Sequence, residues 1–558
     1  MASPSLPLLP CLLTSSLLFS SLFSPTTSSS TQNPNNVQSI CHFTPYPASC
    51  LESQKFTISI SDSTNPSILT SALCSLQAAI SDGTKLASLL CSISPGHNFV
   101  ESQKGSLQDC QDLHQITLSS LKKSMAVLSS SADGCSCKLA DVRAYLSAAV
   151  TNNATCLEGL AGARGSQKAS LLASWAITYE HVSNSLDLVA RLGPRRPGGR
   201  RRRLLSSAAS SGGFPAWVSL RDRRLLQSDD DDDGGDGDDY GEYNPSSVVT
   251  VAADGTGNFT TVGEAIAFAP NNSADRIIVL VRAGVYEENV EISADKSNIV
   301  LIGDGSNVTV IRGNRSVGDG WTTFRSATVA VSGDGFLARD ITFQNTAGPA
   351  KHQAVALRVN ADLAAVYRCV IDGYQDTLYV HSFRQFYREC DIYGTVDFLF
   401  GNAAVIFQGC NIVAKNPLPG QYNAIAAQSR DDPNEETGIS IQNCSVLASD
   451  ELASSNSSTK TYLGRPWRLY SRTVYIESYL GGLVDPAGWT EWMGNQGLDA
   501  LYFGEYMNSG PGSGTDGRVT WPGYHIMDYN DASNFTASEF IDGDEWLDST
   551  SFPYDDGI

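Results

Sequence analysis

Basic residues and long hydrophobic runs are both scarce in this chain of 558 residues. Lys and Arg total 38 against 59 Asp and Glu, a formal net charge of −21. Nucleic acids and anionic lipid surfaces are bound largely through their phosphate charge, so this balance argues against both partners. Beyond the first 25 residues, no apolar run approaches the ~20 residues of a membrane-spanning helix, which excludes an integral membrane protein. The length of 558 residues suits two to four domains, and a hydrophobic content of 41% supplies their cores and excludes disorder throughout.

Two familiar kinds of site are also missing. The chain has neither a Gly-x-Ser-x-Gly elbow nor a Ser-His-Asp order, so nothing supports serine-hydrolase chemistry. Its 13 cysteines include no paired Cys-x-x-Cys groups of the kind that bind zinc. Disulfide bonds formed in an oxidising compartment explain the cysteines better.

The N-terminal segment predicts secretion. Residues 6–23 are rich in Leu, Ser and Phe and carry no charge, which indicates a signal peptide over residues 1–25. A buried helix or a membrane anchor is the alternative, because the first residues lack the usual Lys or Arg. Asn-x-Ser/Thr sequons suit a secreted glycoprotein. They begin at Asn153, Asn258, Asn271, Asn307, Asn314, Asn443, Asn456 and Asn534.

Residues 38–192 are predicted to form an all-α bundle of about four helices. This region is rich in Ser, Ala and Leu, and its apolar residues recur at helical spacing. The clearest series, in which only the threonine is polar, is Leu107, Cys110, Leu113, Thr117, Leu121, Met125 and Leu128.

Residues 193–247 are predicted to form an exposed linker, because blocks of like charge alternate with Gly and Pro. The pattern Arg-Arg-Leu-Leu occurs twice, the second time just before an acidic run at 229–233. Dibasic pairs in the linker of a secreted protein indicate proteolytic processing, and a merely solvated run of charge is the alternative. The candidate processing residues are Arg202, Arg203, Leu204, Leu205, Arg223, Arg224, Leu225 and Leu226.

From residue 248 to 558 the pattern changes to short β-branched runs between Gly, Asn and Asp, with one helical segment at Val262–Phe268. The predicted strands are Ile277–Val281, Ile299–Ile302, Thr328–Val331, Ala354–Val359, Val405–Ile412, Ile439–Val446 and Thr473–Ile476.

The form Cys-x-Ile/Val recurs in this segment at Cys369, Cys390, Cys410 and Cys444, the first three separated by 21 and 20 residues. A period near 20 built from short strands predicts a parallel β-helix rather than a β-sandwich. Successive coils lie about 4.8 Å apart, which brings equivalent Cα atoms within disulfide range. On spacing alone, Cys369–Cys390 and Cys390–Cys410 are both possible.

The same period predicts a catalytic pair of carboxylates. Asp376 and Asp397 are 21 residues apart, so they should face the same side from adjacent coils, with Gln353 and Gln375 nearby. Two carboxylates about 5 Å apart cannot both ionise cheaply, so one becomes a general acid while the other stays charged as a nucleophile or base. A solvated ladder of aspartates is the alternative, but the flanking aromatic and Gln residues favour a site.

Leu463-Gly-Arg-Pro-Trp467 places a guanidinium beside an indole. Arg465 could hold a carboxylate with two hydrogen bonds, and Trp467 could stack on a sugar ring. An ordinary turn with a packed Trp is the alternative.

Residues 249–553 resemble plant pectin methylesterases through five motifs in the same order. They are Gly284-Val-Tyr-Glu-Glu288, Gln353-Ala-Val-Ala-Leu-Arg358, Gly373-Tyr-Gln-Asp-Thr-Leu-Tyr379, Asp397-Phe-Leu-Phe-Gly401 and Leu463-Gly-Arg-Pro-Trp467. The resemblance implies a right-handed parallel β-helix that hydrolyses galacturonate methyl esters of pectin, without metal or organic cofactor. It also implies a secreted enzyme of the cell wall, which we expect to be a monomer.

The resemblance also implies roles for individual residues. Asp397 would be the nucleophile, and Asp376 the general acid and then base. Gln353 and Gln375 would donate to the oxyanion, and Arg465 would keep Asp397 ionised. Substrate-binding positions would be Thr323, Gln353, Phe400, Arg465 and Trp467. The resemblance favours Cys390–Cys410 as the disulfide of this domain.

The helical region resembles the invertase and pectin methylesterase inhibitor family, whose two disulfides would correspond to Cys41–Cys50 and Cys110–Cys156. Cys74, Cys91, Cys135 and Cys137 fall outside that pattern. The arrangement implies a pro-region that inhibits or chaperones the enzyme until the linker is cut, and separate inhibitor proteins of the same family as possible partners.

Two other functions stay open on sequence alone: a binding or inhibitory protein with an inactive enzyme half, and another β-helix pectinase such as a lyase or a polygalacturonase. Residues from 248 onward carry 19 basic and 38 acidic side chains, a charge of −19. This charge predicts repulsion of demethylated pectin, relieved by salt. The exception would be a groove left positive by local arginines such as Arg465 and Arg468.

Overall fold

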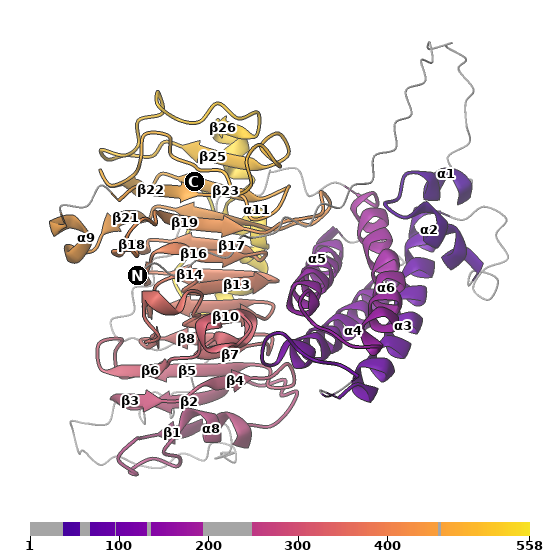
Figure 1. The fold of residues 1–558 in the computed structure, drawn as a ribbon, viewed down its shortest axis with the longest axis horizontal. Helices are drawn as coiled ribbons and strands as arrows, with labels where there is room; N and C mark the ends of the chain where they lie inside the picture. Colours follow the sequence, from indigo (N-terminus) through magenta and orange to yellow (C-terminus); the bar gives the residue numbers. More distant parts are fainter. Residues whose placement is uncertain are drawn as a thin grey trace, which may run out of the picture.

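The computed structural model describes residues 37–55, 67–94, 96, 98–130, 136–193, 248–455 and 459–558, without the side chains of residues 136–138 and 248. The predicted signal peptide and residues 194–247 of the linker, with all eight candidate processing residues, lie outside this part. The described chain forms a helical bundle beside a tall stack of strands (Figure 1). Within it, no helix is both long and apolar enough to span a bilayer.

The predicted helical bundle is confirmed. Its helices are α1 (Val37–His42), α2 (Pro47–Ser53), α3 (Ile68–Ser92), α4 (Ser106–Ser130), α5 (Ser136–Leu160) and α6 (Gln167–Ala190). The predicted apolar series of α4 packs into the bundle core. Cys41–Cys50 joins α1 to α2, and Cys110–Cys156 joins α4 to α5, as the resemblance implied. Neither disulfide includes Cys74 or Cys91.

Three parallel sheets follow, and neighbouring strands of each sheet come from successive coils of a parallel β-helix. The 11-stranded sheet contains β1 (Val248–Val251), β2 (Ile277–Val281), β5 (Ile299–Gly303), β8 (Leu337–Arg339), β11 (Ala364–Tyr367), β14 (Arg384–Arg388), β17 (Ala404–Gln408), β20 (Gly438–Gln442), β23 (Arg472–Ile476), β25 (Tyr502–Tyr506) and β26 (Tyr524–Ile526). The 7-stranded sheet contains β4 (Val290–Ile292), β7 (Val329–Val331), β10 (Leu357–Asn360), β13 (Leu378–Ser382), β16 (Val396–Gly401), β19 (Asn423–Gln428) and β22 (Thr461–Gly464). The 8-stranded sheet contains β3 (Gly284–Glu287), β6 (Thr309–Gly313), β9 (Thr342–Asn345), β12 (Val370–Asp372), β15 (Asp391–Gly394), β18 (Asn411–Ala414), β21 (Ser445–Ala448) and β24 (Tyr479–Leu480). The predicted β-helix is therefore confirmed.

The cysteine repeat marks a one-residue turn between the 11-stranded and 8-stranded sheets. The residue before each cysteine has a left-handed backbone, with φ of 50° at Arg368, 51° at Glu389, 62° at Gly409 and 48° at Asn443. After that turn the cysteine side chain enters the core between the sheets. The strands that follow pair in register, Val370 with Asp391, Asp391 with Asn411, and Asn411 with Ser445.

The disulfide expected at Cys390–Cys410 is absent, and both residues are buried free thiols, as are Cys369 and Cys444. Stacking places these residues side by side, and their sulfurs make hydrogen bonds instead of a disulfide. The Cys390 backbone N–H donates to the Cys410 sulfur at 3.5 Å, and the Cys410 N–H donates to the Cys444 sulfur at 3.3 Å. The Cys410 and Cys444 sulfurs therefore each accept a backbone N–H of the preceding coil, while the Cys390 thiol donates to the Arg388 carbonyl.

Helix α8 (Val262–Phe268) has the predicted bounds, but the expectation that helices are otherwise nearly absent is wrong. The further helical elements are α9 (Asp450–Ser454), α10 (Tyr529–Ser533), α11 (Ala537–Ile541), α12 (Gly543–Trp546), η3 (Val317–Asp319), η4 (Phe324–Ser326), η5 (Pro349–Lys351) and η6 (Leu547–Thr550). Apolar residues of α10–α12 pack on outward side chains of the 11-stranded sheet, forming a second core on that face.

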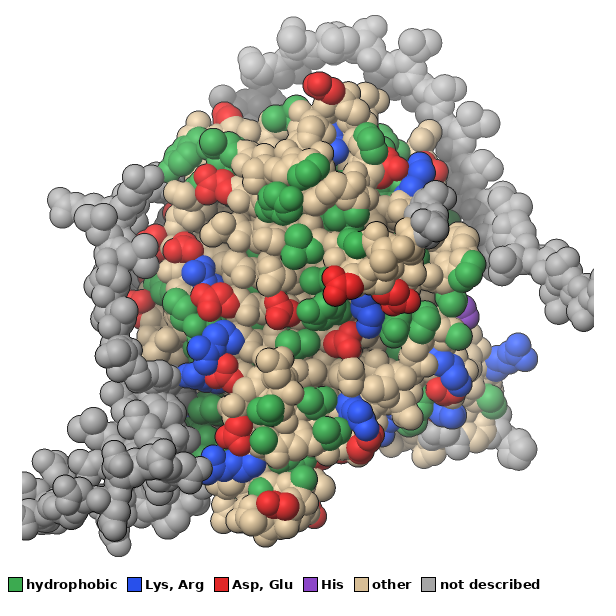
Figure 2. Space-filling view, turned by 90° about the vertical axis from the view of Figure 1, so that its left-hand side faces the viewer, with side chains coloured by type: hydrophobic (Ala, Val, Ile, Leu, Met, Phe, Trp, Pro, Cys, Tyr) green, Lys and Arg blue, Asp and Glu red, His purple; other side chains and the backbone are tan. Residues whose placement is uncertain are grey.

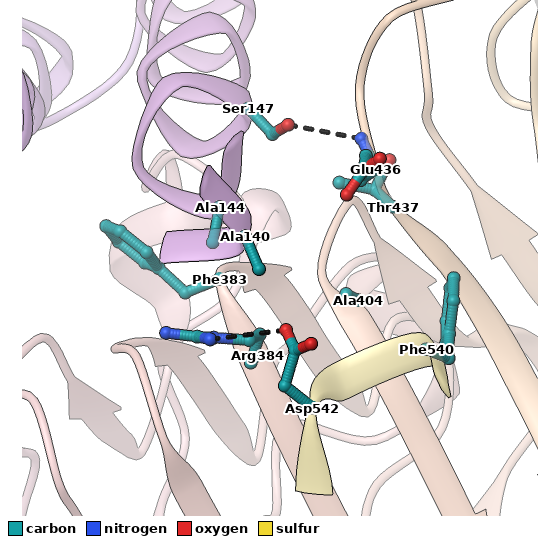
Figure 3. Close-up of a pocket in the computed structure, with 10 residues that line it drawn as sticks. All are labelled: Ala140, Ala144, Ser147, Phe383, Arg384, Ala404, Glu436, Thr437, Phe540 and Asp542. Atoms are coloured by element: carbon teal, nitrogen blue, oxygen red, sulfur yellow. Dashed lines mark hydrogen bonds and ion pairs between the residues drawn. The ribbon is translucent and has the colours of Figure 1, made fainter. Parts of the chain in front are cut away.

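The bundle lies against the 7-stranded sheet, with α5 nearest to it (Figure 1). Figure 2 shows the opposite face of the β-helix, where acidic and basic side chains are interspersed. Figure 3 shows part of the contact between the domains, where Ser147 of α5 accepts the backbone N–H of Glu436; beside it, Arg384 of β14 pairs with Asp542 within the β-helix domain. Arg384 also pairs with Asp141 of α5 at 2.8 Å. Polar and charged contacts therefore hold the bundle on this face together with apolar packing, since the bundle core continues into Tyr379 and Phe400 of the 7-stranded sheet.

Candidate active site

A cavity of about 270 Å³ lies between the 7-stranded sheet and the bundle. The loops before β7 and β10, the turn before β13, strand β16 and the loop after β22 supply its β-helix side. All the residues that the resemblance assigned to catalysis or substrate binding line this cavity: Thr323, Gln353, Gln375, Asp376, Asp397, Phe400, Arg465 and Trp467. Residues spread over more than 140 positions of the chain thus converge on one site.

Asp376 and Asp397 occupy equivalent positions on adjacent coils, as their spacing predicted. Strand β13 pairs with β16 through Leu378 opposite Leu399 and Tyr379 opposite Phe400, the same 21-residue offset. Both aspartates have left-handed backbones, with φ of 62° at Asp376 and 53° at Asp397. Asp tolerates this conformation better than most residues, although it still costs about 1–3 kcal/mol. The surrounding strands therefore hold two strained residues with their carboxylates in the cavity.

Arg465 binds both carboxylate oxygens of Asp397. Its Nε donates to Asp397 Oδ1 at 2.7 Å and its Nη2 donates to Oδ2 at 2.5 Å. A third guanidinium nitrogen donates to the Tyr422 hydroxyl at 3.0 Å, and the Trp492 ring lies 4.1 Å from the guanidinium carbon. These contacts leave the planar group little freedom, so it fixes the carboxylate in orientation as well as in charge.

The environment separates the acidities of the two carboxyl groups. Burial, and then the charge of Asp397, hold the pKa of Asp376 well above its usual range. Burial also raises the pKa of Asp397, but the hydrogen bonds and the charge of Arg465 act against that rise. A single proton shared by the pair therefore resides on Asp376, which leaves Asp397 as the carboxylate.

Gln353 and Gln375 also lie side by side. The backbone N–H of Ala354, next to Gln353, donates to the Gln375 carbonyl at 3.2 Å. Both side chains line the cavity, and among the described residues neither side-chain amide has a hydrogen-bond partner. Their N–H groups are therefore available to an oxygen bound beside Asp397.

Aromatic rings form the floor of the cavity, and sequence reasoning found only some of them. Tyr379 and Phe400 stack with ring centroids 4.1 Å apart. Trp467 stacks with Trp492 at 6.3 Å. Trp492 and the Tyr422 partner of Arg465 carry no sequence signal, because they lie in loops outside the repeat. Flat apolar rings of this kind suit the face of a sugar.

The bundle closes the other side of the cavity, which sequence reasoning did not foresee. Gln103 and Asp109 reach it from α4 and the segment before that helix, and Thr155, Glu158 and Gly159 reach it from α5. Thr155 also hydrogen-bonds to Nε2 of the buried His381 at 2.9 Å. The described residues contain no group of three or more His, Cys, Asp or Glu side chains placed to hold a metal ion.

We predict that Arg465→Lys lowers the maximal rate at this site by about 10–100-fold although it keeps the charge, because an ammonium cannot reproduce two parallel hydrogen bonds. The pKa of Asp397 should also rise when those bonds are lost. Loss of activity toward low pH should then begin at a higher pH than in the wild type. A pH–rate profile measures both effects, and an unchanged rate would reduce Arg465 to a turn residue.

Comparison with known proteins identifies both parts of the chain. Residues 248–544 match the family model described as Pectinesterase, and residues 35–188 match that of Plant invertase/pectin methylesterase inhibitor. "Probable pectinesterase/pectinesterase inhibitor 12" of Arabidopsis thaliana is 58% identical over 551 residues, 98% of each chain. "Pectinesterase 2" of Citrus sinensis is 43% identical over 542 residues, 96% of this chain and 98% of its own. The solved structure of "Pectin methylesterase from Carrot" is 53% identical, with a TM-score of 0.55, and covers 57% of this chain and 100% of its own.

Proposed function

The chain belongs to the pectinesterase family and is a pectin methylesterase with an N-terminal inhibitor-like domain, and from this premise we propose that Asp397 is its nucleophile. The observation that supports this role is the asymmetry of the carboxylate pair. Arg465 holds Asp397 with two hydrogen bonds, whereas the pKa of Asp376 is held well above its usual range by burial and by the charge of Asp397. One cavity thus contains a fixed carboxylate and a protonated acid.

The first half of the reaction forms an acyl-enzyme. A carboxylate oxygen of Asp397 attacks the ester carbonyl carbon at C6 of galacturonate. The carbonyl oxygen becomes an oxyanion that accepts N–H groups of Gln353 and Gln375, each worth about 2.7–4 kcal/mol in comparable sites. When the intermediate collapses, the bond to the methoxy oxygen breaks and Asp376 supplies the proton that completes methanol.

The second half restores the enzyme. Asp376, now ionised, removes a proton from a water molecule, and the resulting hydroxide attacks the acyl carbon. The bond to Asp397 breaks, which regenerates the Asp397 carboxylate and releases the galacturonic acid unit, whose carboxyl proton is then lost to solvent. Asp376 is left protonated for the next cycle, so the same group serves first as acid and then as base. No cofactor takes part in these steps.

We further propose that the bundle inhibits the enzyme until it is removed. A cavity of about 270 Å³ is smaller than the sites that hold typical drug-sized ligands, and α4 and α5 close it on the outer side. A pectin polymer therefore cannot lie across the catalytic residues while the bundle is docked. Secretion to the cell wall through the signal peptide, followed by cleavage in linker 193–247, would release the active domain of residues 248–558.

Expression of the full chain in a secreting host tests these proposals together. We expect secreted enzyme that begins after Leu226 and releases methanol from pectin without new reducing ends or unsaturated products. Replacing Arg223 and Arg224 by Ala should retain precursor-sized protein whose methanol release is roughly 100-fold lower, because a tethered domain acts at millimolar effective concentration. Arg195 and Arg196, a pair in the same linker without following leucines, provide the control substitution. A wild-type product whose N-terminus precedes residue 193 would contradict processing, and active precursor would contradict inhibition.

A further inference from the structure

Arg325 of the β-helix binds two carboxylates of the bundle. Its Nε donates to Asp109 Oδ1 at 2.7 Å and its Nη2 to Asp112, both on α4. The Thr322 hydroxyl donates to the other oxygen of Asp109 at 2.5 Å. Asp109 is buried, with only 2% of its surface exposed, and it lines the catalytic cavity. The β-helix thus offers a built carboxylate site, a guanidinium edge and a hydroxyl, immediately beside the catalytic residues.

A second arginine repeats this arrangement. Arg468, which follows Trp467 in the loop after β22, pairs with Glu158 of α5. Glu158 lines the same cavity as Asp109. Two carboxylates of the bundle therefore enter the site, and each is met by an arginine of the β-helix.

The two arginines flank the catalytic pair along the stack of coils. Arg325 belongs to η4, just before β7, and Arg468 follows β22. In the 7-stranded sheet, two strand steps separate β7 from β13 of the Asp376 coil, and two more separate β16 of Asp397 from β22. At about 4.8 Å a step, each arginine lies on the order of 10 Å from the catalytic coils, on opposite sides.

Removal of the bundle would leave these arginines with few partners. Among the described residues, the one ion-pair partner that Arg325 would keep is Glu291, which lies 3.6 Å away and whose side chain is half exposed. In the described part of the chain, Arg468 has one ion-pair partner, Glu158. A charge that has lost its partner in a partly buried site gains most from a new carboxylate. On unesterified galacturonate units, pectin carries that group.

We propose that Arg325 and Arg468 bind free galacturonate carboxylates on the two sides of the ester being cleaved, and that Asp109 and Glu158 occupy these positions in the unprocessed chain. The proposal rests on the proposed function of the same site. It assigns to Arg325 and Arg468 the discrimination between partly demethylated and fully methylated pectin. The charge of −19 led us to expect that the enzyme repels demethylated pectin, and the proposal reverses this expectation. Acidic side chains also lie away from the groove, mixed with basic ones on the face in Figure 2, whereas the groove presents arginines.

The test uses the full chain with a specific protease site inserted in the linker, so that the enzyme folds with its bundle and is then cut. The β-helix core contains no bundle residue, so the released domain retains it. Binding of a demethylated oligogalacturonate is measured by calorimetry, which needs no turnover. We expect Arg325→Gln and Arg468→Gln each to weaken binding about tenfold. Arg312→Gln, which breaks the surface pair with Glu287, is the matched control and should have no effect.

Kinetics on two substrates provide the second readout. The ratio of kcat/KM on half-methylated pectin to that on highly methylated pectin should fall about tenfold in Arg325→Gln. Added salt should weaken oligogalacturonate binding more in the wild type than in this variant. The inference would be overturned if both arginine variants bound the oligogalacturonate as tightly as the wild type, or if kcat/KM fell equally on the two pectins. Methanol release by the wild type would still uphold the proposed function in that case. Absence of methanol release from the wild type would overturn the function, while the calorimetry still reports on the arginines.

Discussion

Asp397→Asn should abolish methanol release, lowering kcat by roughly 10⁴-fold or more, as loss of the nucleophile does in other covalent hydrolases. An amide oxygen is a far poorer nucleophile than a carboxylate, and it offers Arg465 no charge to pair with. The residual rate should come from direct attack by water on the ester, with the developing oxyanion still stabilised by the Gln353 and Gln375 amides. Methanol assays on the processed enzyme at high substrate concentration measure the loss directly.

This substitution is informative because its structural cost is small. Asn tolerates a left-handed backbone as well as Asp does, so φ of 53° at this position should persist. Unchanged thermal unfolding would show that the fold is retained. Asp391→Asn, six residues earlier and bonded to Asn411 outside the cavity, is the matched control and should keep full activity. If Asp397→Asn retained activity within about threefold of wild type, under ~1 kcal/mol of barrier, another residue would have to be the nucleophile.

Periodicity explains why so much of the site could be predicted from sequence. In a β-helix, an offset of 21 residues corresponds to one coil, so Asp376 and Asp397 fall opposite each other for the same reason that Cys369 and Cys390 do. The repeat identifies neighbours only where coils are in register. Trp492 and Tyr422 complete the surroundings of Arg465 from loops outside that register, and no spacing rule could place them.

The predicted bounds of two strands are wrong, because each predicted strand contains a residue at which the chain turns. The run Val405–Ile412 is two strands, β17 and β18, separated by Gly409 with φ of 62° and by Cys410. Ile439–Val446 divides in the same way at Asn443. Apolar residues continue through such turns because their side chains remain in the core, so hydropathy shows one run where the backbone makes two strands.

The contacts between the two domains could not be predicted from the sequence. Asp109 lies 216 residues from Arg325, and Glu158 lies 310 residues from Arg468. Both acids occupy ordinary positions on amphipathic helices, where a charged residue usually faces solvent. Only the docking of the bundle on the 7-stranded sheet reveals that they point into the catalytic cavity. The expected Cys390–Cys410 bridge is wrong although the spacing allowed contact: the Cys410 sulfur accepts a backbone N–H, and the Cys390 thiol donates to the Arg388 carbonyl at 3.4 Å.

Asp376→Asn should lower kcat by roughly 10³-fold, because this one residue serves both halves of the proposed reaction. Without its proton, methoxide must leave as a strong base, and without its carboxylate no group activates water for deacylation. The left-handed backbone, with φ of 62°, again suits Asn. Asp372→Asn, in the same coil but paired with Lys415 outside the cavity, is the matched control. Methanol release and single-turnover measurements separate the two halves.

The pH profile makes the prediction specific to an acid catalyst. The pKa of Asp376 lies well above its usual range, chiefly through burial and then through the charge of Asp397, so the group is protonated at moderate pH. In the wild type, activity should fall as pH rises through that pKa, because the fraction able to donate a proton decreases. Asn has no such proton to lose, so the residual activity of the variant should show no fall at high pH. An alkaline fall that persisted in Asp376→Asn would assign the general acid to a different group, since the one removed could not be its source.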